Sequence, residues 1–203
     1  MLCRSLLRLA ASIFGVSLAV APAVAHPSVL ECSAEQAVYR LQTDDGLLEI
    51  GFIPATAFIS AASDLYLYLT TTQRTYWFSF SVSNGYSGMT LHPVSDPSAA
   101  SAQEGGPREL LQEYLEEDAD PIETEIWSSL RFYALDADMT FLFEPPLSGE
   151  PAPAYVMAPE IGLTLWYQPQ ALTEDTTADR DSIPRGIFPL VECLPQPRAK
   201  VRP

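Results

Sequence analysis

The chain contains two histidines, His26 and His92, and they are its first candidates for chemistry. Removal of an N-terminal leader after Ala25 would free the amine of His26. That amine, the His26 imidazole and the His92 imidazole would offer three nitrogen ligands, a set that suits copper(II). Because Pro27 has no amide N–H, an imidazole brace is the mode of chelation left open. The sequence thus offers two interpretations: a copper-binding protein or oxidase, or an exposed N-terminal histidine with a surface His92.

Aromatic side chains suggest a second kind of site, suited to binding. On the strand pairing derived below, one face of the central sheet carries a group of flat rings: Tyr66, Tyr68, Trp77 and His92. Such rings can stack against a sugar or contact a partner protein of the cell envelope. Alternatively, a helix or a second sheet covers this face, since a domain of this size usually needs two packed layers. Solvent exposure of Trp77 distinguishes the two interpretations.

Other catalytic arrangements have little support. The sequence has no G-x-S-x-G motif, and Gly85-Tyr86-Ser87-Gly88 lies in a predicted hairpin, not at a strand-to-helix turn. A Ser-His-Asp triad would have to recruit one of the two histidines. A carboxylate pair for glycoside hydrolysis stays open, because 26 Asp and Glu residues offer many pairs. We therefore favour a non-enzymatic function and keep an enzyme, including a copper enzyme, as the alternative.

An acidic run marks the middle of the chain. Its members are Glu113, Glu116, Glu117, Asp118, Asp120, Glu123 and Glu125. We interpret the run as a solvated helix end and loop. A calcium site is the alternative, although the spacing matches no EF-hand loop, which needs a central glycine and a closing glutamate.

The first 25 residues have the pattern of a secretory signal peptide. Arg4 and Arg8 form a basic start, residues 9–20 are apolar, and Ala23-Val24-Ala25 is a small-residue cleavage site. We therefore expect a secreted, periplasmic protein whose mature chain starts at His26. No later apolar run approaches the length of a membrane span, so we expect none after signal removal.

The charge of the mature chain argues against some partners. Without Arg4 and Arg8, nine basic residues remain against 26 acidic ones. Nucleic acids and anionic membranes are bound through clustered Lys and Arg, which this composition lacks. The nine-residue C-terminal segment 195–203 is basic and proline-rich, and we predict that it is disordered.

The mature chain would keep two cysteines, Cys32 and Cys193. In an oxidising compartment they should form a disulfide. The bond would join the two ends of a single domain over residues 26–194. The chain-entropy model assigns on the order of 5 kcal/mol to so long a loop, and measured values usually fall below that.

Residues 65–93 predict three consecutive antiparallel strands. Asn84-Gly85 is the strongest turn signal, because both central positions of a type I′ turn need positive φ. A two-residue loop there would place Phe80 opposite Met89 and Trp77 opposite His92.

The preceding hairpin of this meander turns near Thr72-Gln73, which would place Leu69 opposite Tyr76 and Tyr68 opposite Trp77. A one-residue slip would move the leucines to the wrong face, so burial fixes the register. Phe78 should therefore point inward and Trp77 outward.

Alternating apolar residues predict further strands on both sides of the meander. These are residues 38–43 and 47–53, turned at Asp44-Asp45-Gly46, then 127–135, 139–144, 161–167 and 186–194. The best helix candidate is 107–118, opened by Pro107 with Glu109 in its first turn. The pattern indicates a mainly β fold, an antiparallel β-sandwich or partly open barrel of about eight strands with one helix.

Overall fold

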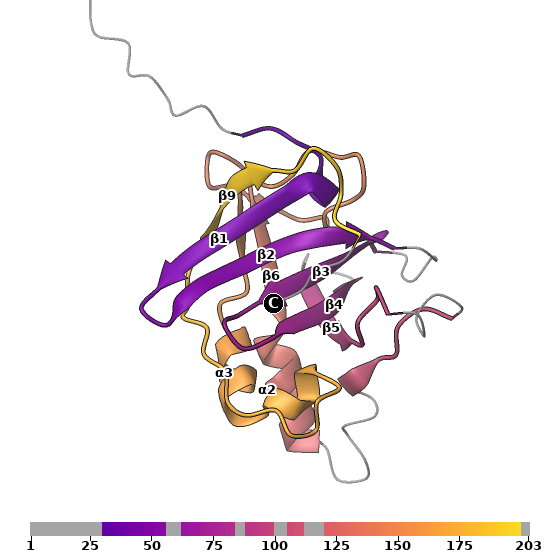
Figure 1. Ribbon diagram of the computed structural model, residues 1–203, viewed down its shortest axis with the longest axis vertical. Coiled ribbons are helices and arrows are strands. Elements are labelled where there is room, and N and C mark those ends of the chain that lie inside the picture. The colour runs from indigo at the N-terminus through magenta and orange to yellow at the C-terminus, as the bar shows by residue number, and fades with distance from the viewer. Residues whose placement is uncertain (1–29, 56–61, 84–87, 100–104, 112–119, 200–203) are drawn as a thin grey trace, which may run out of the picture.

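The computed structural model describes residues 30–55, 62–83, 88–99, 105–111 and 120–199, and the structure is discussed for these residues alone. They form an antiparallel β-barrel (Figure 1). The strands are β1 (Ala37–Thr43), β2 (Gly46–Pro54), β3 (Leu65–Thr70), β4 (Thr75–Val82), β5 (Met89–Val94), β6 (Arg131–Leu135), β7 (Phe141–Leu142), β8 (Tyr155–Met157) and β9 (Phe188–Cys193).

The sheet order is β5-β4-β3-β2-β1-β9-β8-β6-β7, and an additional pairing of β5 with β6 closes the barrel. Eight strands form the closed wall, while β7 is an extra strand paired with β6. The predicted fold class is confirmed, with the barrel closed because β6 returns to β5. Closure satisfies the backbone groups that the two outermost strands of an open sheet would expose.

Two α-helices lie together at one end of the barrel (Figure 1). The α-helices at this end are α2 (Asp120–Ser129) and α3 (Ile161–Tyr167). The described residues also include helical Leu110 and Leu111 and two short 3-10 helices, η1 (Ala34–Gln36) and η3 (Pro169–Leu172). The hydroxyl groups of Ser129 and Thr164 are hydrogen-bonded and buried, which links α2 to α3. Within the described residues, no helix has the length and apolar character needed to span a membrane.

Aromatic rings fill the barrel interior. Phe52, Phe80 and Phe132 form a group in which the ring centroids of each pair lie 5.3 to 6.5 Å apart. All three side chains are buried, as is Phe78 on the same face of β4. The inward parity predicted for the phenylalanines is therefore confirmed.

Two predicted hairpins are found, and the β3–β4 hairpin has the predicted register. In the β1–β2 hairpin, Thr43 pairs with Gly46 around Asp44 and Asp45, and Gly46 has a φ of 133° that favours glycine. In the β3–β4 hairpin, Leu69 pairs with Tyr76 and Tyr68 with Trp77.

The β4–β5 register differs from the prediction by two residues. Val82 pairs with Met89 and Ser79 with His92, and the Ser83 N–H donates to the Gly88 carbonyl. The connection is therefore longer than a two-residue Asn84-Gly85 turn, and residues 84–87 lie outside the described residues. Because the shift is even, every side chain keeps its predicted face.

Residues 161–167 form a helix, so the predicted strand is wrong here. Ile161 and Leu165, one helical turn apart, are buried, whereas Leu163 and Tyr167 are exposed. Alternation would have placed all four on one face. A short apolar run fits both the two-residue period of a strand and the 3.6-residue period of a helix, so packing against the rest of the protein determines which one forms. At Gly162 the backbone carbonyl of Ile183 approaches so closely that a Cβ would lie 2.3 Å from it.

Two other element predictions need correction. The strand predicted over 127–135 begins at Arg131, because α2 continues through Ser129. Pro107 and Glu109 are not in a first helical turn, since Glu109 forms a β-bridge with Val94. Leu110 and Leu111, which lie within the predicted helix, are helical and buried. Residues 112–119 of the predicted helix lie outside the described residues, and of the acidic run only 120–125 are described.

The two chain ends of the barrel meet at the predicted disulfide. Cys32 and Cys193 are bonded, with their Cα atoms 5.9 Å apart. Beyond it, the Arg198 guanidinium lies 2.6 Å from a Glu49 carboxylate oxygen and over the Tyr68 ring. Disorder of the segment 195–203 in solution stays a prediction.

Candidate functional site

The predicted aromatic group shares the outer face of β3, β4 and β5, but its rings are covered. Tyr66 and Tyr68 are almost fully buried and Trp77 is 6% exposed. They form a second apolar cluster outside the barrel, together with Ile53 and Val94. The exposure of Trp77 that an open stacking surface requires is therefore not found, and ligand binding by these rings stays a prediction that would need their cover to move.

Tyr68 is held from several sides. Its ring lies across Gly51, where an added Cβ would come within 2.7 Å of three ring and hydroxyl atoms. Its hydroxyl donates to Glu49 at 3.1 Å, and the Arg198 guanidinium lies 5.5 Å from the ring centroid. Glu49 also accepts from Arg40 at 2.8 Å. Tyr68 is thus part of the packing that fixes the C-terminal segment.

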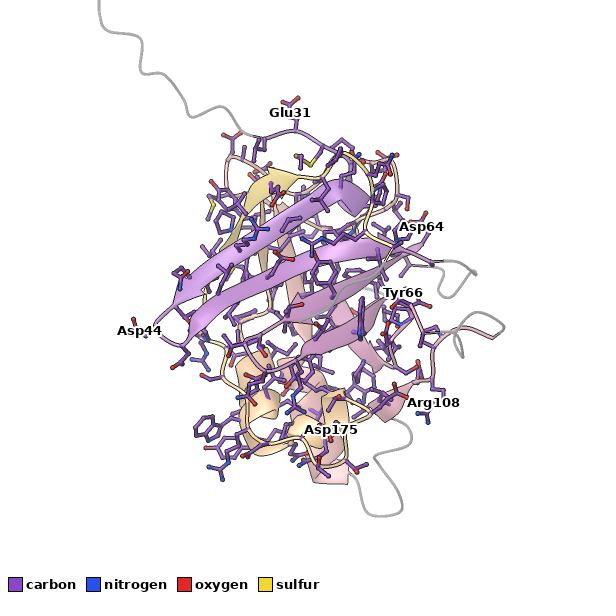
Figure 2. The ribbon with its side chains drawn as sticks, in the orientation of Figure 1. Glu31, Asp44, Asp64, Tyr66, Arg108 and Asp175 are labelled. Carbon is purple, nitrogen blue, oxygen red and sulfur yellow. A yellow bond between two sulfur atoms is a disulfide. The ribbon has the colours of Figure 1, made fainter. Side chains whose placement is uncertain are left out.

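The hydroxyl group of Tyr66, unlike that of Tyr68, makes no hydrogen bond within the described residues. Its hydroxyl oxygen is buried and has no hydrogen-bond partner within the described residues. Burial raises the pKa of the Tyr66 phenol, so it stays neutral. Figure 2 shows Tyr66 on the same side of the barrel as Asp64 and Arg108.

His92 is the partly exposed member of the predicted group, with 26% of its side chain accessible. Its Nδ1 lies 3.6 Å from a Glu109 carboxylate oxygen, and its ring packs edge-on to Trp127 with centroids 4.5 Å apart. Burial lowers the pKa of His92, and the nearby Glu109 carboxylate opposes this by a smaller amount. The imidazole is therefore neutral near pH 7 and can both donate and accept a hydrogen bond.

A groove of about 590 Å³ opens beside His92. It lies where the β3–β4 ladder ends at Leu67 and Phe78 while β4 continues along β5. The polar groups in its lining are Ser79, Ser81, His92, Glu109 and Glu144. The apolar groups are Ala62, Phe80, Val82, Val94, Pro107, Pro145 and Leu147. The groove is large enough for a small-molecule ligand.

Sequence reasoning placed His92 on the correct face but missed most of its neighbours. Ser79 and Ser81 have the same parity as Trp77, so they could have been included from the strand pattern. Glu109 was assigned to a helix and Trp127 to a strand, and no signal in the sequence places either beside His92.

The predicted copper site is only half within the described structure. His26 lies outside the described residues, so a copper site at His26 and His92 stays a prediction. Among the described residues, no three His, Cys, Asp or Glu side chains are grouped closely enough to hold a metal ion.

Comparison of the chain with protein-family models, with curated proteins and with solved structures gave no match. The chemistry of the groove is therefore the basis for assigning a function.

Proposed function

We propose that this protein is a non-enzymatic binding module of the cell envelope, secreted or periplasmic, that takes a neutral carbohydrate in the groove beside His92. The observation that carries the proposal is the mixed lining of the groove. One histidine, two serine hydroxyls and two carboxylates lie among prolines and aliphatic side chains. Sites for small ligands usually combine a mainly apolar lining with a few convergent polar groups.

Charge narrows the class of ligand. Glu109 and Glu144 line the groove, and no Lys or Arg among the described residues does. The two carboxylates would repel an anionic ligand. Such a ligand would also lose bound water on entering the groove, and no cation in the lining would compensate for that loss. A neutral ligand rich in hydroxyl groups fits better: Ser79, Ser81 and neutral His92 can each donate and accept, and carboxylates accept from sugar hydroxyls. The pyrrolidine rings of Pro107 and Pro145 can contact the C–H face of a sugar.

The contacts of His92 support a binding role over catalysis. In a serine hydrolase, the histidine accepts a hydrogen bond from the nucleophilic serine. Across the described residues, no hydrogen bond joins His92 to the hydroxyl of Ser79 or Ser81, although Ser79 is its cross-strand partner. The Cys32–Cys193 bond supports the proposed compartment, because disulfides persist where conditions are oxidising.

Calorimetric titration of the protein with neutral oligosaccharides tests the proposal. The panel contains cello-, malto- and chito-oligosaccharides and a soluble peptidoglycan disaccharide, with a sulfated heparin fragment as the anionic comparison. We expect binding of at least one neutral sugar and none of the heparin fragment.

Variants locate the site in the same titration. Ser81→Leu should weaken binding by about tenfold, because it removes a hydroxyl and fills the groove. Ser182→Leu, at an exposed serine outside the groove, should leave the affinity unchanged. Absence of binding across the neutral panel, or equal affinity of the two variants, would contradict the proposal.

A further inference from the structure

The barrel carries a second feature, an exposed apolar surface around β7, which adjoins the groove beside His92 and shares Leu147 with its lining. We call it the β7 surface, and its exposed apolar members are Tyr133, Met139, Phe141, Leu142, Phe143 and Leu147. Phe143 is 63% exposed and Phe141 49%. Contiguous exposed apolar groups on this scale usually mark a contact with another molecule. We propose that the β7 surface binds an extended, apolar and basic segment of a partner protein.

Several members of the β7 surface lie against one another or line the same groove. The rings of Tyr133 and Phe141 are in edge contact, with centroids 5.7 Å apart. Two grooves of about 570 and 710 Å³ adjoin β7, and Leu142, Pro151 and Pro153 line both of them. A continuous surface of this kind can accept several side chains of one chain segment.

The backbone of β7 provides a way to align such a segment. β7 pairs with β6 through Leu142 and Phe141, and it is the last strand in the sheet order. The end strand of a sheet can pair with an added strand through main-chain hydrogen bonds, while pockets on either side receive alternate side chains. An extended peptide therefore suits this site better than a helix.

The charges beside the β7 surface select the chemistry of the partner. Carboxylates line both grooves: Glu31 and Asp136 in one, Glu144 and Glu150 in the other. Neither lining contains a Lys or Arg. None of these four carboxylates is in an ion pair within the described part of the chain. A partner with Lys or Arg flanking its apolar residues would meet unpaired negative charge, which speeds association and selects the partner.

The same charges disfavour two other occupants. A second copy of the chain, paired β7 to β7, would bring two sets of unpaired carboxylates together. An anionic membrane would be repelled in the same way.

Fluorescence anisotropy with labelled peptides tests the proposal. The probe is a peptide of alternating Val and Lys, and the comparison peptide has Glu in place of every Lys. We expect the basic peptide to bind, the acidic peptide not to bind, and affinity to fall as salt increases, because exposed charges are screened.

Matched variants assign the binding to the β7 surface. Phe143→Ser should weaken the affinity by about tenfold or more, as expected at an anchoring aromatic residue. Glu144→Lys should also weaken it and, at an exposed side chain, should leave the fold intact. Tyr167→Ser is the control: Tyr167 is 67% exposed. It lies on α3, at the end of the molecule opposite Glu31 (Figures 1 and 2).

Three outcomes would overturn the proposal: no binding of the basic peptide, equal binding of the two peptides, or equal affinity of Phe143→Ser and Tyr167→Ser. Sedimentation of the free protein as a dimer that Phe143→Ser dissociates would also overturn it, in favour of a second copy. Retained thermal midpoints in all variants keep a loss of affinity separate from unfolding.

Discussion

Two features of its surroundings have opposite effects on the pKa of His92. Burial lowers its pKa from the ordinary value of 6.5, and Glu109 only partly offsets this. As pH falls, the unfolded chain therefore takes up the proton on this residue before the folded chain does. Stability contributed by neutral His92 is present above about pH 6.5 and is lost as pH falls through that value towards the folded pKa.

We predict that the difference in thermal midpoint between the natural protein and His92→Gln shrinks on acidification. The contributions of all other titrating groups to the thermal midpoint cancel in this difference, because the two proteins share those groups. Scanning calorimetry at about pH 8 and about pH 5 measures the difference. A difference that stays constant or grows at the lower pH would show that folding does not lower the pKa of His92.

Two neighbouring tyrosines should respond in opposite ways to loss of the hydroxyl. The buried Tyr66 hydroxyl has no partner among the described residues, whereas that of Tyr68 donates to Glu49. An unpaired buried hydroxyl costs about 1–3 kcal/mol, and a made hydrogen bond contributes about 1 kcal/mol. We expect Tyr66→Phe to raise the free energy of unfolding and Tyr68→Phe to lower it, as measured by urea titration. The same sign for both variants would contradict this assignment.

At the residue scale, the face on which each site residue lies could be predicted, but the exposure of its side chain could not. Strand parity placed Tyr66, Tyr68, Trp77 and His92 on one face, because alternation needs only local geometry. Their exposure could not be predicted, because it depends on segments distant in sequence. The Arg198 guanidinium reaches Tyr68 across 130 positions, and no local pattern in either segment indicates the contact.

At the scale of elements, the number of residues in an alternating segment determined whether its secondary structure could be predicted. The β1–β2 and β3–β4 hairpins have enough alternating residues to fix their registers. Residues 161–167 are too few to distinguish a strand from a helix, and the choice depends on how α3 docks against Ile183. The end of α2 at Ser129 likewise depends on packing.

The C-terminal segment gives a prediction at this scale. Arg198 has 27% of its side chain exposed and joins Glu49, which is 15% exposed, while Arg185 is 75% exposed and pairs with Glu160. Arg198→Ala should lower the free energy of unfolding by about 1 kcal/mol, through loss of the ion pair and of the contact with Tyr68. Arg185→Ala should change it by less than about 0.5 kcal/mol. Equal effects in chemical denaturation would mean that the segment does not pack on the barrel in solution.

At the scale of the whole molecule, the β5–β6 pairing closes the sheet into a barrel, and the Cys32–Cys193 bond joins the two ends of the domain covalently. Most strands followed from the sequence pattern, although β8 was not predicted and residues 161–167 are helical. The disulfide also followed, because two cysteines in an oxidising compartment leave one pairing. Closure itself could not be predicted, since the β5–β6 contact consists of two residue pairs separated by the segment around α2.

Replacing both cysteines with serine should lower the free energy of unfolding by about 2–5 kcal/mol, because the bond restricts the unfolded chain over a long loop. The sequence separation of the two residues is 161. Urea titration of the variant and of the natural protein under oxidising conditions measures the loss. An unchanged midpoint would mean that the bond does not form in solution.

The position of this bond also determines how the protein would carry tension. A pull applied upstream of Cys32 and downstream of Cys193 would pass through two sulfur atoms and bypass every strand. The barrel would then remain folded under forces that unravel ordinary domains, and the linkage would not lengthen. Reduction would place the strands in the load path, and unravelling would release on the order of 500 Å of chain.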